Sequence, residues 1–316
     1  MKKFLSIAII VILIAIIASP TTYIDVCFDA ITVWATVLLP SLLPFFIFTK
    51  LLTSLGYVKN ASNCFGKLMY KIYHTPPISS YAFIMSILTG YPVGSKLIAD
   101  LYHNNMLSKE DAKKCIAFTS NSGPMFIVGS VGVGMLLSAQ AGYILYASHI
   151  VGALINGLLY RGKKCKDDAP YIIENNNNND ATLSSCVMDS IFSVLLIGGI
   201  VAVAFIIIEI LNNLNVFYPI VYILQKIGID ANISTGILGG MLEITKGCID
   251  ISSLSLSLYT KTVICSAIIS FGGISTVMQS MAFLKDITGY GYFIKQKTTH
   301  MIFSTITCAV LSIALI

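Results

Sequence analysis

Charged residues are scarce in this sequence: they make up 11% of its 316 residues, whereas 56% are apolar and the mean hydropathy is +0.82. So few polar side chains cannot coat the surface of a soluble globule of this length. The composition therefore excludes a soluble domain and predicts a polytopic membrane protein surrounded by the lipid bilayer. The net charge of +5 comes from short lysine and arginine patches beside apolar segments, so it indicates membrane topology and no nucleic-acid partner.

Signatures of catalysis are also missing. The sequence contains no serine nucleophile elbow, no zinc-protease helix motif and no phosphate-binding loop. The eight cysteines lack the paired spacing of a metal or redox centre, and His103, His149 and His300 show no metal-ligand spacing. We therefore expect no enzymatic activity, no metal and no organic cofactor, and we leave open a coupling ion, either H⁺ or Na⁺.

What the chain does contain is an internal duplication. Lys96 and Asp100 recur as Lys246 and Asp250 at an offset of 150 residues (246−96 and 250−100). The same offset relates Leu88 to Leu238, Gly90 to Gly240, Cys115 to Cys265, Ser120 to Ser270 and Gly123 to Gly273. In a membrane protein, a repeat with glycine-broken apolar segments at matching places predicts a transport site where the two copies meet.

Long apolar segments set the domain organisation. A transmembrane helix needs about 20 apolar residues, a criterion met by residues 31–55, 115–137, 141–160, 184–211, 261–284 and 298–316. Residues 1–18 are either a signal peptide or a first transmembrane helix, and residues 20–30 are expected outside. We divide the chain into N-terminal scaffold helices (1–55), a first repeat (56–160), a cytoplasmic linker with five consecutive asparagines (161–183), a scaffold helix (184–211) and a second repeat (212–316).

Two apolar stretches, residues 78–88 and 233–238, are too short to cross a bilayer. Each meets a glycine, Gly90 or Gly240, and continues as another short helical stretch, so we expect two re-entrant hairpins with their tips at these glycines. Because cytoplasmic loops carry the excess of Lys and Arg, we expect the basic patches at residues 2–3, 59–71, 109–114, 161–166 and 285–297 in the cytoplasm. This places the N-terminus and the entry of the first hairpin on the cytoplasmic side. Three crossings separate the hairpins, so the second copy must be inverted.

An amphipathic pattern precedes each hairpin. Residues 59–74 and their counterpart, roughly 217–229, space apolar and basic side chains as helices lying on a membrane surface would.

A polar run interrupts the apolar segment that begins at Cys115. Asn121, Ser122 and Gly123 precede Pro124 there, and the second copy offers Ser270, Gly272 and Gly273. Ser and Asn favour a helix N-cap and proline the first helical position, so we expect a broken helix whose second half begins at Pro124. The free N–H groups of the two breaks would then form an anion-binding cradle near the membrane centre. The alternative is that the glycines serve only close helix packing and a kink.

Three charged residues are candidates for function. Lys96 and Lys246 lie six residues beyond Gly90 and Gly240, where each could bind a solute carboxylate or simply pair with the aspartate one turn further on. Glu243 stands where the first copy has Val93, and an acid at that depth predicts a coupling site for H⁺ or Na⁺. The alternative for Glu243 is a structural contact, for example with Lys246.

The stretches 88–102 and 117–134 resemble the sporulation integral membrane protein YlbJ (SpoVV) family, in the nucleoside-recognition Gate domain group. Residues 39–45, 239–247 and 270–273 extend the similarity, which covers the chain from about residue 30. The resemblance implies an all-α polytopic fold with an inverted repeat, two re-entrant hairpins and two broken transmembrane helices, similar to concentrative nucleoside transporters.

The same resemblance implies a function in endospore formation. The expected role is transport of dipicolinic acid, a small anionic solute, across the outer forespore membrane or the cell membrane. A nucleoside-type transporter and a non-transporting scaffold factor remain alternatives, and a homo-oligomer is left open. The substrate-binding prediction comprises Asn121, Ser122, Gly123, Ser270, Gly272, Gly273, Lys96 and Lys246.

Overall fold

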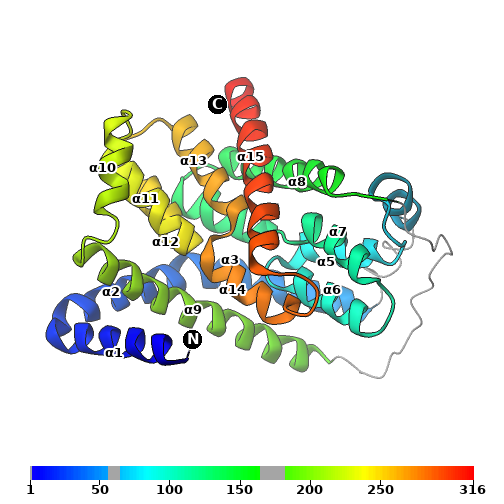
Figure 1. Ribbon diagram of the computed structural model, residues 1–316, viewed down its shortest axis with the longest axis horizontal. Coiled ribbons are helices and arrows are strands. Elements are labelled where there is room, and N and C mark those ends of the chain that lie inside the picture. The colour runs from blue at the N-terminus through cyan, green and yellow to red at the C-terminus, as the bar shows by residue number, and fades with distance from the viewer. Residues whose placement is uncertain (1, 56–64, 164–181) are drawn as a thin grey trace.

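The computed structural model describes residues 2–55, 65–163 and 182–316, and these residues are helical apart from short connections (Figure 1). The N-terminal part comprises α1 (Lys2–Ala18), α2 (Pro20–Val33), the π-helical segment η1 (Trp34–Leu38) and α3 (Leu39–Ser54). The first repeat comprises η2 (Met69–Tyr73), α5 (Ser79–Thr89), α6 (Val93–His103), α7 (Lys109–Thr119), η3 (Met125–Met135) and α8 (Ala139–Leu159). After α9 (Leu183–Asn213), the second repeat comprises α10 (Tyr218–Lys226), α11 (Ala231–Leu242), α12 (Ile244–Ser253), α13 (Leu258–Phe271), α14 (Gly273–Leu284) and α15 (Tyr290–Leu315).

The duplication is visible helix by helix. Adding 150 to the bounds of α5, α6 and α7 gives 229–239, 243–253 and 259–269, where α11, α12 and α13 lie. The same shift carries η3 onto 275–285 and α8 onto 289–309, where α14 and α15 lie. Each copy is therefore a helical hairpin, a helix broken in the middle and a long final helix.

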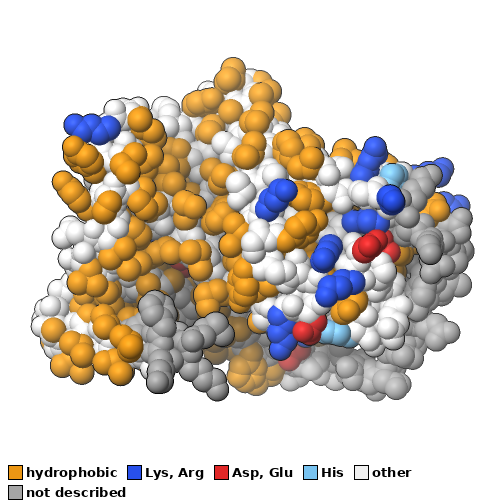
Figure 2. Space-filling view, in the orientation of Figure 1, with side chains coloured by type: hydrophobic (Ala, Val, Ile, Leu, Met, Phe, Trp, Pro, Cys, Tyr) orange, Lys and Arg blue, Asp and Glu red, His pale blue; other side chains and the backbone are white. Residues whose placement is uncertain are grey.

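Five helical segments are long and apolar enough to cross a membrane: Pro20–Leu52, Ala139–Leu159, Leu183–Asn213, Leu258–Leu284 and Tyr290–Leu315. They confirm a multi-pass integral membrane protein. Figure 2 shows apolar side chains over most of the visible surface, with Lys and Arg gathered toward the end where α6 and α7 lie. Residues 20–30 belong to the helix α2, which leads through η1 into α3, and their expected place outside stays a prediction.

The scaffold helices pack as one group. Figure 1 shows α9 running beside α2 and α3, and a buried apolar cluster joins them, with members including Leu38, Leu42, Val201 and Phe205. The Trp34 indole N–H donates to the carbonyl of Val194 at 2.9 Å. This group forms one wall against which the two repeats lie.

The segments preceding the hairpins are helical where the structure describes them. Residues 65–73 form a short helix on which Phe65 and Leu68 are exposed, and α10 holds the corresponding place in the second copy. Most of the predicted linker, residues 164–181, lies outside the described residues.

Two helical hairpins are present, α5 with α6 and α11 with α12. At about 1.5 Å per residue, an 11-residue helix such as α5 spans about 16 Å, roughly half of the apolar core of a bilayer. Entry of each hairpin from one membrane face, and the opposite orientation of the two copies, stay predictions from the charge pattern.

The first hairpin turns at Gly90, but Gly240 is not the turn of the second. Gly240 lies inside α11, which continues to Leu242 before the chain turns at Glu243. A Cβ at Gly247 would lie 2.2 Å from the Cα of Gly240, so these glycines allow α11 and α12 to pack backbone to backbone. Gly240 therefore serves close helix packing, and the turn forms three residues later.

This packing predicts a stability difference between two glycine substitutions. Gly247→Ala forces α11 and α12 apart and should cost about 1–3 kcal/mol. The matched control is Gly199→Ala in α9, where no atom lies within 4 Å of the added Cβ; it should be neutral or stabilising by up to about 1 kcal/mol, because alanine favours a helix. Thermal unfolding of the purified protein in detergent measures both. Equal melting temperatures for the two variants would contradict this account of the second hairpin.

Candidate functional site

A cavity of about 100 Å³ lies where the two repeats and the scaffold meet. On the scale in which one water needs about 10–15 Å³, this volume accommodates several waters or one small organic molecule. Its walls come from α3, α9, the tips of both hairpins, the break between α7 and η3, and α14. The sequence prediction that function lies where the two copies meet corresponds to this cavity.

In the first copy, the hairpin tip rests directly on the broken helix. Gly90 has a φ of +78°, and a Cβ there would lie 2.5 Å from the backbone nitrogen of Gly123. Only glycine permits this approach. As predicted, residues 120–123 are non-helical and the second half-helix begins at Pro124.

The second copy repeats this contact with different residues at the tip. Gly272 and Gly273 have φ values of +90° and +67°, and they separate α13 from α14. A Cβ at Gly273 would lie 3.1 Å from the carbonyl oxygen of Leu242, the last residue of α11. Gly123 and Gly273, one repeat length apart, thus hold the same position against the two hairpin tips.

Because the helix breaks and the hairpin tips lie at the cavity, several helices have their N-terminal ends there. The segment after Gly123, the start of α12 after Glu243 and the first turn of α14, with Ser275 and Thr276, all contribute lining residues. The first N–H groups of a helix have no intrahelical partner, and the N-terminal end carries about half a positive charge. The site is therefore suited to an anion or to a solute rich in hydrogen-bond acceptors.

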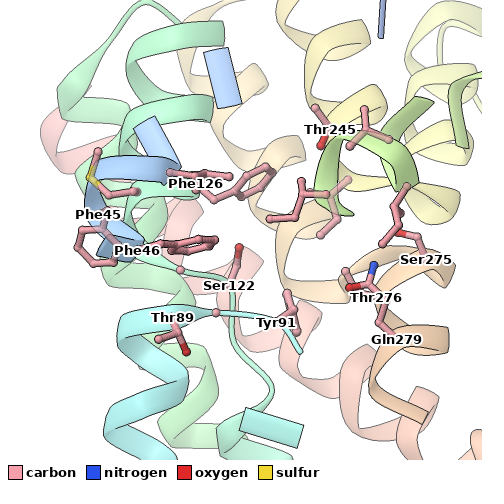
Figure 3. A pocket seen from close by; sticks show the side chains of 18 of the residues that line it. Phe45, Phe46, Thr89, Tyr91, Ser122, Phe126, Thr245, Ser275, Thr276 and Gln279 are labelled. Atoms are coloured by element: carbon pink, nitrogen blue, oxygen red, sulfur yellow. The ribbon is translucent and has the colours of Figure 1, made fainter. Parts of the chain in front are cut away.

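The remaining lining combines aromatic and hydroxyl groups. Figure 3 shows Phe45, Phe46, Thr89 and Ser122 on one side of the cavity, facing Thr245, Ser275, Thr276 and Gln279 on the other. Tyr91 and Phe126 complete the aromatic part of the wall. Flat apolar faces and neutral donors and acceptors are what an aromatic ring with polar substituents requires.

Glu243 lies at the tip of the second hairpin and is 5% exposed. One carboxylate oxygen accepts the backbone N–H of Lys246 at 2.9 Å, and the other accepts the hydroxyl of Thr245 at 3.1 Å. Glu243 therefore caps α12 and lines the cavity at the same time. The structural alternative considered from the sequence, a contact with Lys246, is realised through the backbone of that residue.

The two predicted solute-binding lysines do not line the cavity. Lys96 lies on the exposed face of α6, because Gly94, Ser95 and Ile98 occupy the face that packs inward. The ammonium of Lys246 is 2.5 Å from the carboxylate of Asp250, one turn along α12. For Lys246 the structure thus shows the alternative role, an ion pair with Asp250.

Of the predicted cradle, Ser122 and Gly123 line the cavity, whereas Asn121, Ser270, Gly272 and Gly273 lie behind its wall. The Asn121 amide donates to the Ser86 hydroxyl at 3.0 Å and to the carbonyl of Phe118 at 2.8 Å. These residues hold the breaks in shape.

His149 on α8 joins the two breaks, a role that no pattern in the sequence indicated. Its Nε2 accepts the backbone N–H of Ser122 at 3.0 Å, and its Nδ1 lies 2.9 Å from the hydroxyl of Ser270. Because an N–H can only donate, the bond from Ser122 assigns the neutral ring with its proton on Nδ1. The imidazole thus connects the first repeat to the second at their broken helices.

Lys297 is also missed by the sequence interpretation, which counted it in the cytoplasmic basic patch 285–297. The structure corrects this, because Lys297 is 2% exposed inside α15. A signal was present in the spacing: Phe293, Lys297, His300 and Ser304 recur every three or four residues and form a buried face of α15.

An all-helical membrane protein with two hairpins and two broken helices around one central cavity has the fold of the concentrative nucleoside transporters. Its structure matches CNTnw in an inward-facing, substrate-bound state with a TM-score of 0.63 and 12% identity, over 98% of this chain and 86% of that chain. A second structure, a single-residue variant of CNTnw in its intermediate 3 state, matches with a TM-score of 0.62 and 13% identity, over 100% and 87% of the two chains. At such identities the likeness shows the fold alone.

In sequence, the chain is related to the sporulation integral membrane protein YlbJ of Bacillus subtilis (strain 168). The two are 28% identical over an alignment of 298 positions, and the match covers 86% of this chain and 72% of that protein. This relationship confirms the resemblance drawn from the sequence motifs. No protein-family profile matches the sequence.

The bridging role of His149 predicts that its replacement loosens the junction of the repeats. His149→Leu leaves the buried N–H of Ser122 without its partner, at a cost of about 1–3 kcal/mol. His103→Leu is the matched control, since the side chain of His103 is 53% exposed. Melting temperatures in detergent should fall clearly for His149→Leu and hardly for His103→Leu. A junction that does not depend on His149 would leave both variants as stable as the unmodified protein.

Proposed function

We propose that this chain is a secondary transporter for a small anionic aromatic solute, with dipicolinic acid as the leading candidate. The observation that carries the proposal is the cavity formed jointly by both hairpin tips, the first break and the first turns of α14. In transporters built from repeats, substrates bind between the copies, at half-helix N-termini. This cavity has both features.

The chemistry of the lining supports an aromatic dianion. Phe45, Phe46 and Phe126 offer faces for a planar ring, and the N-terminal ends of η3 and α14 favour carboxylates. Dipicolinic acid, a pyridine ring with two carboxylates, combines these two properties in one small molecule. The relationship to a sporulation integral membrane protein supports a place in a membrane of a sporulating cell, for which we propose the outer forespore membrane or the cell membrane. The basic patches support an N-terminus in the cytoplasm.

A nucleoside is the second candidate. Thr276 and Gln279 are neutral hydrogen-bonding groups that suit a ribose or a base, and the fold is that of CNTnw. The ionisable group in the lining, Glu243, would repel an anion if it carried a full charge, whereas a neutral nucleoside would be indifferent to it. The two candidates therefore differ in what they require of Glu243.

Uptake into proteoliposomes separates these functions. The purified protein should accumulate labelled dipicolinate above the level of empty liposomes, and unlabelled dipicolinate should compete better than uridine or adenosine. Ser122→Ala should weaken solute affinity about 3- to 10-fold, the effect of losing about one hydrogen bond of 0.5–1.5 kcal/mol. Ser54→Ala, at an exposed position near the end of α3, is the control.

If uridine or adenosine competes better than unlabelled dipicolinate, the result favours a nucleoside as the substrate. If the folded protein transports none of these solutes, the chain is better explained as a membrane scaffold required for spore formation, in which the broken helices serve packing alone.

We propose Glu243 as the group that couples uptake to an H⁺ or Na⁺ gradient, because it is a buried carboxylate in the cavity wall. Glu243→Gln keeps an oxygen that can accept the N–H of Lys246 but cannot change its charge. We expect this variant to fold and to bind solute, while losing accumulation against a gradient. Asp250→Asn, which disrupts an ion pair away from the cavity, is the control. Gradient-driven uptake with unchanged pH and sodium dependence in Glu243→Gln would exclude this role.

A further inference from the structure

A buried lysine without an acidic partner lies beside the cavity. The side chain of Lys297 comes from α15 and is 2% exposed. Within the described ranges, no carboxylate lies within ion-pairing distance of it, whereas Lys50, Lys114 and Lys246 each pair with an aspartate. Burying an uncompensated charge is costly, so a lysine kept at such a position calls for a functional explanation.

Three neutral acceptors surround this ammonium. It donates to the Tyr91 hydroxyl at 2.5 Å and to the carbonyl of Ser120 at 2.9 Å, and the Nδ1 of His300 lies 3.3 Å away. The Nε2 of His300 faces the carbonyl of His149 at 3.0 Å, so it must donate, which leaves Nδ1 of the neutral ring as an acceptor. Each of the three N–H bonds of the ammonium therefore has its own acceptor.

The carbonyl of Ser120 is the key member of this set. Ser120 directly follows α7, so its oxygen lies at the negative end of the half-helix dipole. In transporters with broken helices, carbonyls at such half-helix ends are the groups that coordinate the coupling cation. Here that position is already taken by a cation that belongs to the chain.

We propose that Lys297 is a tethered cation, which occupies the C-terminal end of the half-helix α7 in place of a free Na⁺. The inference rests on the proposed transport function and deepens it. It states that the cation at the end of α7 is supplied by the chain itself and is not taken from solution. The ammonium joins the tip of the first hairpin, through Tyr91, to the break of the first broken helix, through Ser120. A Cβ at Gly272 would lie 3.4 Å from the Cε of Lys297, so the same side chain also packs against the second break.

This arrangement has a consequence for the solute. Tyr91 lines the cavity and its hydroxyl is held by the ammonium, so the positive charge lies one residue behind the cavity wall. A fixed cation there favours an anionic solute without a free metal ion, and its attraction is strong in a medium of low dielectric constant. Lys297 is thus a positioning and specificity-determining residue.

Thermal unfolding without solute tests the tethered cation, so the result does not depend on whether transport is observed. All proteins carry Glu243→Gln, which removes the other group in the cavity that could attract Na⁺. With Lys297 intact, the melting temperature should be the same in NaCl, KCl and choline chloride at equal ionic strength. Stabilisation by NaCl over choline chloride would show that the α7 end still takes a free ion, and it would overturn the proposal.

Removing the lysine should create a requirement for a cation. Lys297→Ala leaves three buried acceptors unpaired, and we expect its melting temperature to fall by about 5 °C or more. Propylammonium replaces the missing atoms and should restore most of this loss, whereas 1-propanol, equal in length but uncharged, should not. Lys295→Ala, at an exposed position on the same helix, should neither lose stability nor respond to propylammonium.

Two outcomes would contradict the proposal at this step: equal restoration by 1-propanol and propylammonium, or a Lys297→Met protein as stable as the parent. Lys297→Met keeps the volume of the side chain without its charge, so it covers the case in which Lys297→Ala does not fold.

Discussion

The structure depends on one constraint, which is that backbone groups at a broken helix inside a membrane must find partners within the protein. The Ser122 N–H and the Ser120 carbonyl find their partners in His149 and Lys297. Each hairpin tip also packs against a break, Gly90 on Gly123 and Leu242 on Gly273. Side chains at these contacts would prevent the approach, so glycine is required at Gly90 and Gly273 by both space and backbone angle. The cavity lies between the two hairpin tips, the first break, the start of α14 and the scaffold helices α3 and α9.

The same constraint distributes charge around the cavity. Helix N-termini open onto it, whereas the C-terminal ends of the broken helices are satisfied in two different ways. The carbonyl after α7 receives the Lys297 ammonium, while α13 ends at Gly272, whose N–H returns to the carbonyl of Ile268. His149 then ties the two breaks through Ser122 and Ser270. The two repeats therefore share their order of helices but differ in the groups that satisfy the C-terminal ends of α7 and α13.

Much of this could be predicted from the sequence. The break before Pro124 and the tip at Gly90 were predictable because proline and glycine act locally, and the 150-residue offset gives the helix order of the whole repeat. The second tip was misplaced because a glycine can permit either a turn or close packing, and only the contact of Gly247 with Gly240 distinguishes them. Lys297 was missed because charge counting treats lysines near a helix end as cytoplasmic, although its spacing with His300 marks a buried face.

The two buried charges at the junction show where the copies diverge. Subtracting 150 from Glu243 and Lys297 gives Val93 and Ala147, so each charge stands in the second copy opposite an apolar residue in the first. A duplicated backbone supplies a break and a hairpin tip in each copy, but it cannot by itself supply an acid on one side and a base on the other. That asymmetry supports the proposal that the site responds to ions, because helices that met only to pack would be equally well served by Val93 and Ala147 in both copies.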